Sequence, residues 1–405
     1  MKKHICMIVY SIYTIDTRVR REAETLASES GYSVTVISLK EKAPDRPYYK
    51  DRVQICELNI PKYQGASIIN YLLSYLHFCI MAFFKCTQLF LERGIDVIHV
   101  HNMPNLLVFC GAIPALMGRP IILDVHDTVV ETYSSKFQSI PNRMIRHVMT
   151  TLIRLEESLS CAFADKIIAV NEIQQRRLIE RGIPESKTII SMNVPDPKLF
   201  HRTTPKSRTV PDDHFNIVYF GTLTQRLGID LAIRAIGMLV DQIPGIRFHI
   251  IGDGESKSRF KSLSESLSLG NCVHFSENYY SLEDLIPVLN HMDLCVVPNK
   301  RNAATELMLP VKMMESIALG IPVVAPKLEA IQHYFSDNMA YFFEPDDVDS
   351  LTQAILNAFL GEKERLAKAE NAQLFLDEYG WDNHKQILLD AYKQITTVKN
   401  SNNRR

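Results

Sequence analysis

The residues best suited to bind a charged ligand lie in Glu306–Val324, ELMLPVKMMESIALGIPVV. Lys312 and Glu315 stand three residues apart on a predicted helix that stops at Gly320, so they project from one face of its first turns. A carboxylate there can accept hydrogen bonds from two neighbouring hydroxyl groups, and a lysine can complement a phosphate oxygen. An ion pair at the start of a surface helix would have the same spacing. The position of the pair directly after a buried strand favours a binding site.

A second candidate is the segment Gly221–Leu239, GTLTQRLGIDLAIRAIGML, which follows an apolar strand and opens a helix. Gly221 permits close backbone approach, and Arg226 lies in the loop where a guanidinium can grip a diphosphate through two hydrogen bonds. Free amide groups at the start of the helix form an anion site. Strand-to-helix turns favour glycine in general, so a phosphate loop and an ordinary turn both fit these residues.

A third candidate is His126, which ends the apolar run PIILDVH and precedes Asp127 and Glu131. A histidine at the carboxyl edge of a sheet can hydrogen-bond a ligand hydroxyl or satisfy a structural partner. His99 and His101 lie on one predicted strand, and we expect their side chains to point to opposite faces and not to share a metal ion. The eight cysteines are scattered without a CxxC pair. The sequence therefore predicts no metal site.

Short apolar strands alternate with helical patterns along the whole chain, which is typical of parallel sheets covered by helices. The pattern is interrupted once, by a segment rich in Pro, Asp, Thr and Ser. We therefore expect an α/β protein of two doubly wound, Rossmann-like domains that face each other across a cleft. The expected divisions are a first domain over 1–195, a linker over 196–214, a second domain over 215–378, a helix that returns to the first domain over 379–397, and a polar tail over 398–405.

Composition excludes one class of partner and leaves another open. The 45 basic and 46 acidic residues nearly cancel, which disfavours nucleic acid as the main partner. The segment Ser67–Gly94 is the most apolar, but Asn70, His77 and Lys85 interrupt it, so a helix packed on the sheet is favoured over a membrane-spanning one. Partial burial in a membrane interface is the second interpretation. The start of the chain lacks a signal peptide pattern. We expect a cytoplasmic protein, with contact to the inner face of the membrane as an option.

Taken together, these segments resemble the family 4 retaining glycosyltransferases, also called glycosyl transferases group 1, which have the GT-B fold. IDTRVRREAETLASESGYSVTVISL resembles the first loop, helix and second strand of the family, with Asp-x-Arg in place of a Gly-Gly loop. DVIHVHNMPNLL and ILDVHD are similar to the next two strand ends. FGTLTQRLGIDLAI resembles the phosphate loop, and LPVKMMESIALGIPVVA resembles the nucleotide-sugar helix in a subgroup with Lys-x-x-Glu. The resemblance covers nearly the whole chain, with all segments in order.

The resemblance implies roles for individual residues. Glu315 is similar to a ribose-binding glutamate, and His126 to a histidine beside the donor sugar. Two positions depart from the family pattern: eight residues separate Glu306 from Glu315 where the family has seven, and Leu227 replaces a frequent lysine. The implied catalytic residues are His126 and Glu306. The implied donor-binding residues are Gly221, Thr222, Arg226, Lys312, Glu315, Met308 and Leu309, and those expected on the acceptor side are Tyr13, Arg18 and Glu131.

The implied reaction moves a sugar from a nucleoside-diphosphate sugar to an acceptor hydroxyl with retention of configuration, without a metal or another cofactor. The acceptor expected from the basic first half and the apolar segment is a carbohydrate or a lipid-linked molecule in the assembly of a bacterial-type cell-surface polysaccharide or glycolipid. Two alternatives remain at this point. One is a nucleotide-sugar epimerase of the same fold, and the other is a non-catalytic partner subunit that resembles a glycosyltransferase.

Overall fold

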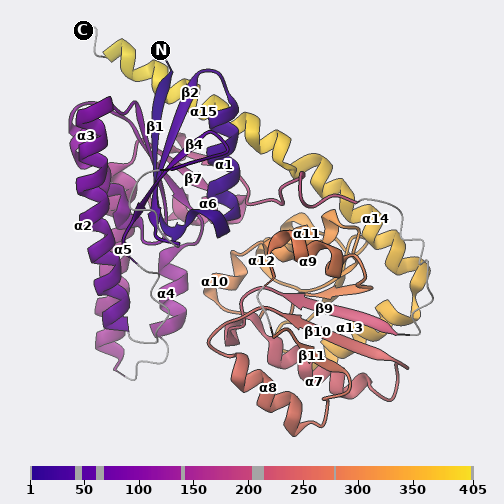
Figure 1. Cartoon of the computed structure of the whole chain (residues 1–405). Coiled ribbons are helices and arrows are strands. Elements are labelled where there is room, and N and C mark those ends of the chain that lie inside the picture. The colour runs from indigo at the N-terminus through magenta and orange to yellow at the C-terminus, as the bar shows by residue number, and fades with distance from the viewer. Residues whose placement is uncertain are drawn as a thin grey trace. The chain divides into compact units, whose positions relative to one another are not determined.

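The structure is a computed structural model that describes residues 2–41, 48–60, 68–137, 142–202, 214–277 and 280–402. The chain divides into two compact units (Figure 1). Unit 1 comprises Met1–Asn193 and Asp382–Arg405, and unit 2 comprises Val194–Trp381. Each unit has its own sheet, combined with helices, which confirms the predicted α/β class with two Rossmann-like domains. Of the predicted linker, residues 203–213 lie outside the described residues.

Unit 1 contains an eight-stranded sheet in the order β3-β4-β2-β1-β5-β6-β7-β8. The neighbouring strands are parallel except for the pair β3 and β4. The central strands are buried on both faces and mostly apolar, although β5 and β6 also carry the buried polar residues His99, His101 and Asp124. The edge strand β3 was not predicted, since its three residues, YYK, form no apolar run. The strands are β1 (Lys3–Ile12), β2 (Tyr32–Leu39), β3 (Tyr48–Lys50), β4 (Val53–Leu58), β5 (Val97–His101), β6 (Ile121–Val125), β7 (Lys166–Ala169) and β8 (Thr188–Ile190).

Alternate side chains of the unit 1 strands face different helices. Cys6 and Ile8 of β1 belong to a core cluster with residues of α2, η2 and α5. His99 of β5 points to the opposite face, where it contacts Tyr392 of the last helix. The helices of unit 1 are η1 (Tyr13–Ile15), α1 (Thr17–Ser28), α2 (Ile68–Arg93), η2 (Asn105–Gly111), α3 (Ala112–Leu116), α4 (Val129–Phe137), α5 (Arg143–Phe163), α6 (Glu172–Glu180), η3 (Glu185–Lys187) and α15 (Trp381–Asn402).

Two helices of unit 1 differ from the prediction. The sequence pattern over residues 106–117 predicts one helix, but the chain forms a 3-10 segment, η2, and then the short helix α3. Pro114 explains the break, because it lacks the N–H that would bond the carbonyl of Cys110 in a continuous α-helix. The last helix was expected to end at residue 397 and to leave a polar tail, yet α15 continues to Asn402. Extending an established helix is favourable even through polar residues.

Unit 2 contains a six-stranded sheet, wholly parallel, in the order β11-β10-β9-β12-β13-β14. All six residues of the central strand β9 (Phe215–Phe220), FNIVYF, are buried. The other strands are β10 (Ile246–Ile251), β11 (Val273–Phe275), β12 (Leu294–Val296), β13 (Val323–Pro326) and β14 (Tyr341–Phe343). The helices are η4 (Gln225–Leu227), α7 (Ile229–Leu239), α8 (Lys257–Ser266), α9 (Leu282–Leu289), α10 (Ala303–Glu306), α11 (Val311–Ala318), α12 (Glu329–Tyr334), α13 (Val348–Leu360) and α14 (Glu362–Tyr379).

Candidate functional site

Two glycines allow the ends of β9 and β10 to approach each other in unit 2. Gly221 follows β9 with a φ of +113°, and Gly252 follows β10 with a φ of +149°. A Cβ atom at Gly252 would lie 1.9 Å from the carbonyl oxygen of Gly221, so only glycine fits there. A Cβ atom at Gly221 would lie 3.3 Å from Nζ of Lys312. The loop after β9 and the helix α11 therefore meet at the carboxyl edge of this sheet.

The ammonium group of Lys312 lies over the ring of Tyr219, beside the Gly221 loop. Its Nζ donates a hydrogen bond of 2.7 Å to the Tyr219 hydroxyl and lies 3.9 Å from the ring centre. Burial, with a smaller contribution from the positive charge of Arg226, lowers the pKa of Lys312 to about 8 against the opposing effects of Cys295 and Glu315. An anion bound next to this lysine would favour its charged form. The residue therefore has the electrostatic character of an anion-binding group.

Arg226 brings a second positive charge to the same edge of the sheet. It lies on η4, directly before α7, and its Nη1 atom is buried without a hydrogen-bond partner among the described residues. The N-cap of α7, Gly228, has a φ of +69° and provides no side-chain cap. A buried guanidinium nitrogen without a partner costs free energy unless a ligand satisfies it. Because the first amides of α7 also point out of the helix end, the site fits a phosphate-containing anion.

Most of the polar groups just before α11 already have hydrogen-bond partners within unit 2. Both carboxylate oxygens of Glu306 are engaged, since one pairs with Arg301 Nε at 2.7 Å and the other accepts the backbone N–H of Glu329 at 2.7 Å. The backbone N–H of Met308 donates to the Thr305 carbonyl at 3.2 Å, and a role of this residue in donor binding stays a prediction. The side chain of Leu309 is 9% exposed, and Thr222 is exposed beside Gly221. The catalytic role of Glu306 stays a prediction.

In unit 1, His126 directly follows β6, and Asp124 of that strand holds its ring. The Nε2 atom of His126 lies 2.9 Å from Oδ2 of Asp124 and 3.1 Å from Nδ1 of His101. The backbone N–H of His126 donates to Oδ1 of Asn102 at 2.8 Å. Burial lowers the pKa of His126, but the charge and the hydrogen bond of Asp124 outweigh burial and raise it overall. The side chain remains 21% exposed, so a ligand can reach it.

A buried charge network supports this histidine. Arg18 of α1 donates to both carboxylate oxygens of Asp124, at 2.8 Å each, and to the carbonyl oxygen of Ser191 at 2.9 Å. The same guanidinium lies 3.3 Å from the Glu22 carboxylate, one turn further along α1. Although burial opposes ionisation of Asp124, the charge of Arg18 holds the pKa of this carboxyl group well below its usual range. Sequence reasoning missed Asp124 and Glu22, although a charged residue inside an apolar strand is a signal that a buried partner exists.

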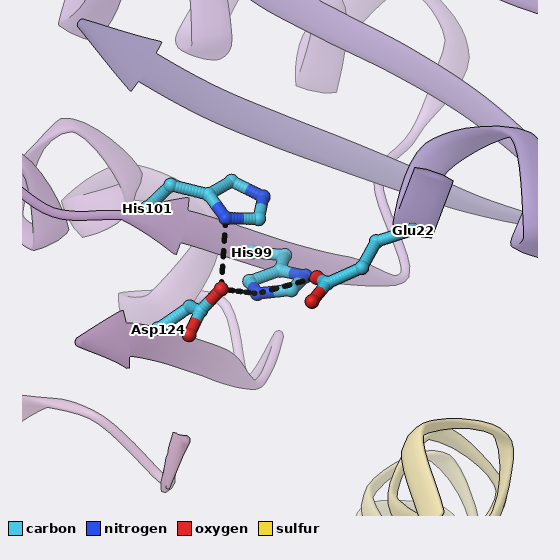
Figure 2. A group of neighbouring side chains, drawn as sticks. All are labelled: Glu22, His99, His101 and Asp124. Atoms are coloured by element: carbon cyan, nitrogen blue, oxygen red, sulfur yellow. Dashed lines mark hydrogen bonds and ion pairs between the residues drawn. The ribbon is translucent and has the colours of Figure 1, made fainter. Parts of the chain in front are cut away.

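The arrangement of His99 and His101 corrects the expectation drawn from the sequence. Residues two apart on a strand share a face, so the prediction of opposite faces was wrong. Their rings are stacked with centres 4.2 Å apart. Figure 2 shows both histidines with Glu22 and Asp124, and ligand atoms of these four residues all lie within 4.8 Å of one another.

This spacing matches a metal site, but the charges present favour another interpretation. Arg18 already contacts both carboxylates, and its positive charge would repel a bound cation. Desolvation, reinforced by His101, lowers the pKa of His99 well below its usual value, and Nδ1 of this histidine lies 2.7 Å from the Tyr392 hydroxyl. We therefore describe the cluster as a compensated ion network behind His126.

The three residues expected on the acceptor side are buried in unit 1. Tyr13 is completely buried, and Arg18 is 2% exposed within the network just described. Glu131 is 8% exposed and pairs with Arg181, which also donates to both oxygens of Glu157, at 2.6 and 2.8 Å. These side chains are buried and paired in the structure, and their role on the acceptor side stays a prediction. The sequence alone does not indicate whether a charged residue is buried or exposed, because this depends on how the elements pack.

Comparison with known proteins identifies the class of both units. The family model described as "Glycosyl transferase 4-like domain" matches residues 14–192, and the model described as "Glycosyl transferases group 1" matches residues 201–375. The first match lies in unit 1, and the second lies in unit 2. The two models follow each other without overlap, in the order expected from the sequence.

Curated relatives carry names from polysaccharide assembly. The amylovoran biosynthesis glycosyltransferase AmsK of Erwinia amylovora is 25% identical over 48% of this chain and 48% of its own length. The putative colanic acid biosynthesis glycosyltransferase WcaL of Escherichia coli is 25% identical over 47% of each chain. The match thus spans about half the length of these relatives. An uncharacterized glycosyltransferase of Haemophilus influenzae is 21% identical over 90% of this chain and 92% of its own length.

Solved structures agree with the fold over almost the whole chain. Sucrose-phosphate synthase from Thermosynechococcus elongatus has a TM-score of 0.79 at 18% identity, covering 98% of this chain and 100% of that structure. Anabaena HepE in complex with UDP has a TM-score of 0.67 at 16% identity, covering 97% and 100%. These similarities show the GT-B fold. The family models assign a glycosyl transferase 4-like domain to residues 14–192, followed by a glycosyl transferases group 1 domain over residues 201–375.

Proposed function

We propose that this protein transfers a sugar from a nucleoside-diphosphate sugar to a hydroxyl group of an acceptor, with retention of configuration at the anomeric carbon. The observation that carries the proposal is the cationic edge of the unit 2 sheet. There the unpartnered Nη1 of Arg226, the ammonium group of Lys312 and the N-terminus of α7 accompany a glycine loop. This combination suits a diphosphate, because each of the three elements stabilises negative charge.

In the proposed complex, Arg226 and Lys312 bind the diphosphate, and Gly221 and Thr222 allow its oxygens to approach the backbone. Glu315, one turn after Lys312, accepts hydrogen bonds from the two ribose hydroxyls. As the bond between the anomeric carbon and the diphosphate breaks, negative charge grows on the leaving group. The two cationic side chains and the helix amides would stabilise this charge in the absence of a metal ion, so we propose a metal-independent reaction.

We also propose a role in the reaction for His126 of unit 1. The raised pKa of His126 favours the protonated form of its ring, and the network behind it keeps the ring in one orientation. We propose that His126 donates a hydrogen bond to a hydroxyl of the donor sugar. The acceptor hydroxyl then attacks the anomeric carbon from the side that the diphosphate leaves, and a departing phosphate oxygen takes the proton of that hydroxyl. This scheme requires no enzymatic nucleophile.

The names of the relatives support a proposal for the biosynthetic process in which this reaction takes place. Amylovoran and colanic acid glycosyltransferases are named for the assembly of bacterial polysaccharides. We propose that the present chain acts in the assembly of a cell-surface polysaccharide or glycolipid, on a carbohydrate or lipid-linked acceptor. The reaction would take place in the cytoplasm, at the inner face of the membrane.

A donor panel tests the proposal. The thermal unfolding midpoint of the wild type should rise with one of the UDP-, GDP- or ADP-sugars, since ligands that bind only the folded state stabilise it. Glu315→Ala and Lys312→Ala should remove that rise. Lys327→Ala is the matched control, because Lys327 is an exposed lysine of the same unit that pairs with Glu344.

The products distinguish the remaining alternatives. Release of nucleoside diphosphate together with a glycosylated acceptor supports the proposal. Release of free nucleotide and of a sugar inverted at one carbon, without any need for an acceptor, would indicate an epimerase. If none of the nucleotide sugars shifts the unfolding midpoint, the chain is better explained as a partner subunit, and the assignments of Arg226, Lys312 and Glu315 fail together.

A further inference from the structure

The amphipathic helix α5 presents its apolar side to solvent. Six large apolar side chains recur at intervals of one to four residues, and each is at least 49% exposed: Met144, Ile145, Val148, Leu152, Leu155 and Leu159. The buried residues of α5 are confined to Glu157, Ser160 and Cys161, near its C-terminus. In a helix that only supports a core, the apolar stripe faces inward. The reversed orientation of α5 therefore points to a partner that covers this stripe.

Helix α2 adds a second apolar stripe. Leu72, Leu73, Leu76 and Phe84 are between 55% and 63% exposed. Both α2 and α5 contact η2, and Figure 1 shows the two helices extending beyond the sheet of unit 1. On η2 itself, Phe109 is 39% exposed and packs on Phe163 of α5, with ring centres 5.0 Å apart. We call the exposed side chains of α2, η2 and α5 named in these two paragraphs the apolar face of unit 1. Exposed apolar side chains in such numbers mark an interaction site.

The charges near the apolar face indicate what kind of partner binds it. On α2, residues 68–91 contain no aspartate or glutamate. On α5, residues 143–155 contain three arginines and no acidic residue, and Glu156 and Glu157 follow at the C-terminal end of the helix. Arg143 and Arg154 are exposed on α5. Over residues 68–91 and 143–155, this surface combines apolar side chains with basic residues and lacks acidic ones. It is therefore complementary to an anionic lipid bilayer, where the apolar groups enter the boundary and the arginines contact phosphate groups.

The opposite side of α2 excludes a spanning role. The segment Leu72–Arg93 is long and apolar enough to cross a membrane. However, Tyr75, Phe78, Ala82, Cys86 and Leu89 are buried in the core cluster of unit 1. Moving α2 into a bilayer would expose that core, so the helix can only lie against the membrane with its other side.

We infer that the apolar face of unit 1 docks the protein on an anionic membrane surface through α2 and α5, without insertion across the bilayer. This inference rests on the proposed function, in which a lipid-linked acceptor lies at such a surface. The binding itself depends only on unit 1. Donor binding depends on unit 2, so the two can fail separately.

Sedimentation with vesicles tests the inference. The full chain is mixed with vesicles of phosphatidylcholine alone or with about a third of phosphatidylglycerol, and we expect binding mainly to the anionic vesicles. The double variant Leu152→Glu, Leu155→Glu should bind at least about tenfold more weakly, because two half-exposed leucines lose their contact with the acyl boundary. The matched control is Leu366→Glu, Leu374→Glu on α14, whose leucines are 52% and 60% exposed in unit 2. It should bind like the wild type.

A second variant separates the charge from the apolar contribution. Arg143→Gln, Arg146→Gln should weaken binding to anionic vesicles by about fivefold per arginine and leave binding to neutral vesicles unchanged. Thermal shifts with the donor, measured without vesicles, should be the same in all variants, so that loss of donor binding is recognised as a failure of the proposed function alone.

Two results would overturn the inference. One is that the wild-type protein sediments no more in the presence of anionic vesicles than it does without lipid. The other is a concentration-dependent dimer in sedimentation velocity that the α5 variant dissociates while vesicle binding is absent, since the apolar face would then be an interface between copies of the chain.

Discussion

Lys312 offers a test in which the structure fixes the direction of a pH effect. Its pKa falls from the usual 10.5 to about 8. That difference corresponds to about 3 kcal/mol of unfavourable charging in the protein without ligand. A bound diphosphate opposes this effect and raises the pKa again. Binding of a nucleoside-diphosphate sugar should therefore take up a proton from solution above pH 7, and affinity should decrease as the pH rises through 8.

Isothermal titration calorimetry in pairs of buffers with different ionisation enthalpies measures this proton uptake. With a pKa of about 8, we expect about 0.1 proton per donor at pH 7, about 0.5 at pH 8 and about 0.9 at pH 9. Lys312→Met should abolish the uptake and weaken binding at pH 7 by roughly 10- to 100-fold, the value of a charge-assisted hydrogen bond. Lys327→Met, which changes an exposed lysine, should behave like the wild type.

Stability without ligand should change in the opposite direction. Because the folded state holds the Lys312 proton less tightly than the unfolded state, this group makes the free energy of unfolding rise with pH between about 8 and 10.5. The difference between wild type and Lys312→Met isolates the contribution from other groups that titrate in this range. Proton uptake that is absent at pH 8, or that persists in Lys312→Met, would refute the assignment of Lys312 as the phosphate-binding cation.

Three further predictions concern the supports of the two sites. Asp124→Asn should lower the free energy of unfolding by about 3–5 kcal/mol, because it leaves the buried Arg18 without its carboxylate; it should also lower the pKa of His126, measured by NMR, whereas the exposed Asp390→Asn should do neither. Gly252→Ala should destabilise the protein by at least about 2 kcal/mol in thermal or urea unfolding, while Gly270→Ala, whose Cβ would have no neighbour within 4 Å, should have little effect. Tyr392→Phe removes the hydrogen bond to His99 and should lower the free energy of unfolding by about 1–3 kcal/mol; unchanged urea unfolding would show that α15 is held without it.

The parts of the fold that depend on apolar runs and turn residues could be predicted from the sequence. The strand FNIVYF, the glycine after it and the helix that carries Lys312 and Glu315 are local patterns, and a parallel sheet necessarily brings its carboxyl ends to one edge. The partners of these residues were not predictable. Tyr219 looks like one more apolar strand residue, and only the packing of α11 on β9 places its hydroxyl 2.7 Å from Lys312 Nζ.

In unit 1, the roles of polar residues could not be predicted, because their partners lie far away in the sequence. Arg18 and Glu131 occupy positions that suggested contact with an acceptor, yet Arg18 binds Asp124, 106 residues later. A charged residue that is buried must be compensated, and the compensating groups come from α1, β5, β6 and α15 together. Periodicity in a sequence indicates which side chains share a face of one element, but not which faces of different elements meet. The same argument gives Tyr392 its significance: the hydroxyl that reaches His99 is supplied by α15, which follows the whole of unit 2 in the chain, so the network behind His126 is complete only when the C-terminal helix has packed on unit 1.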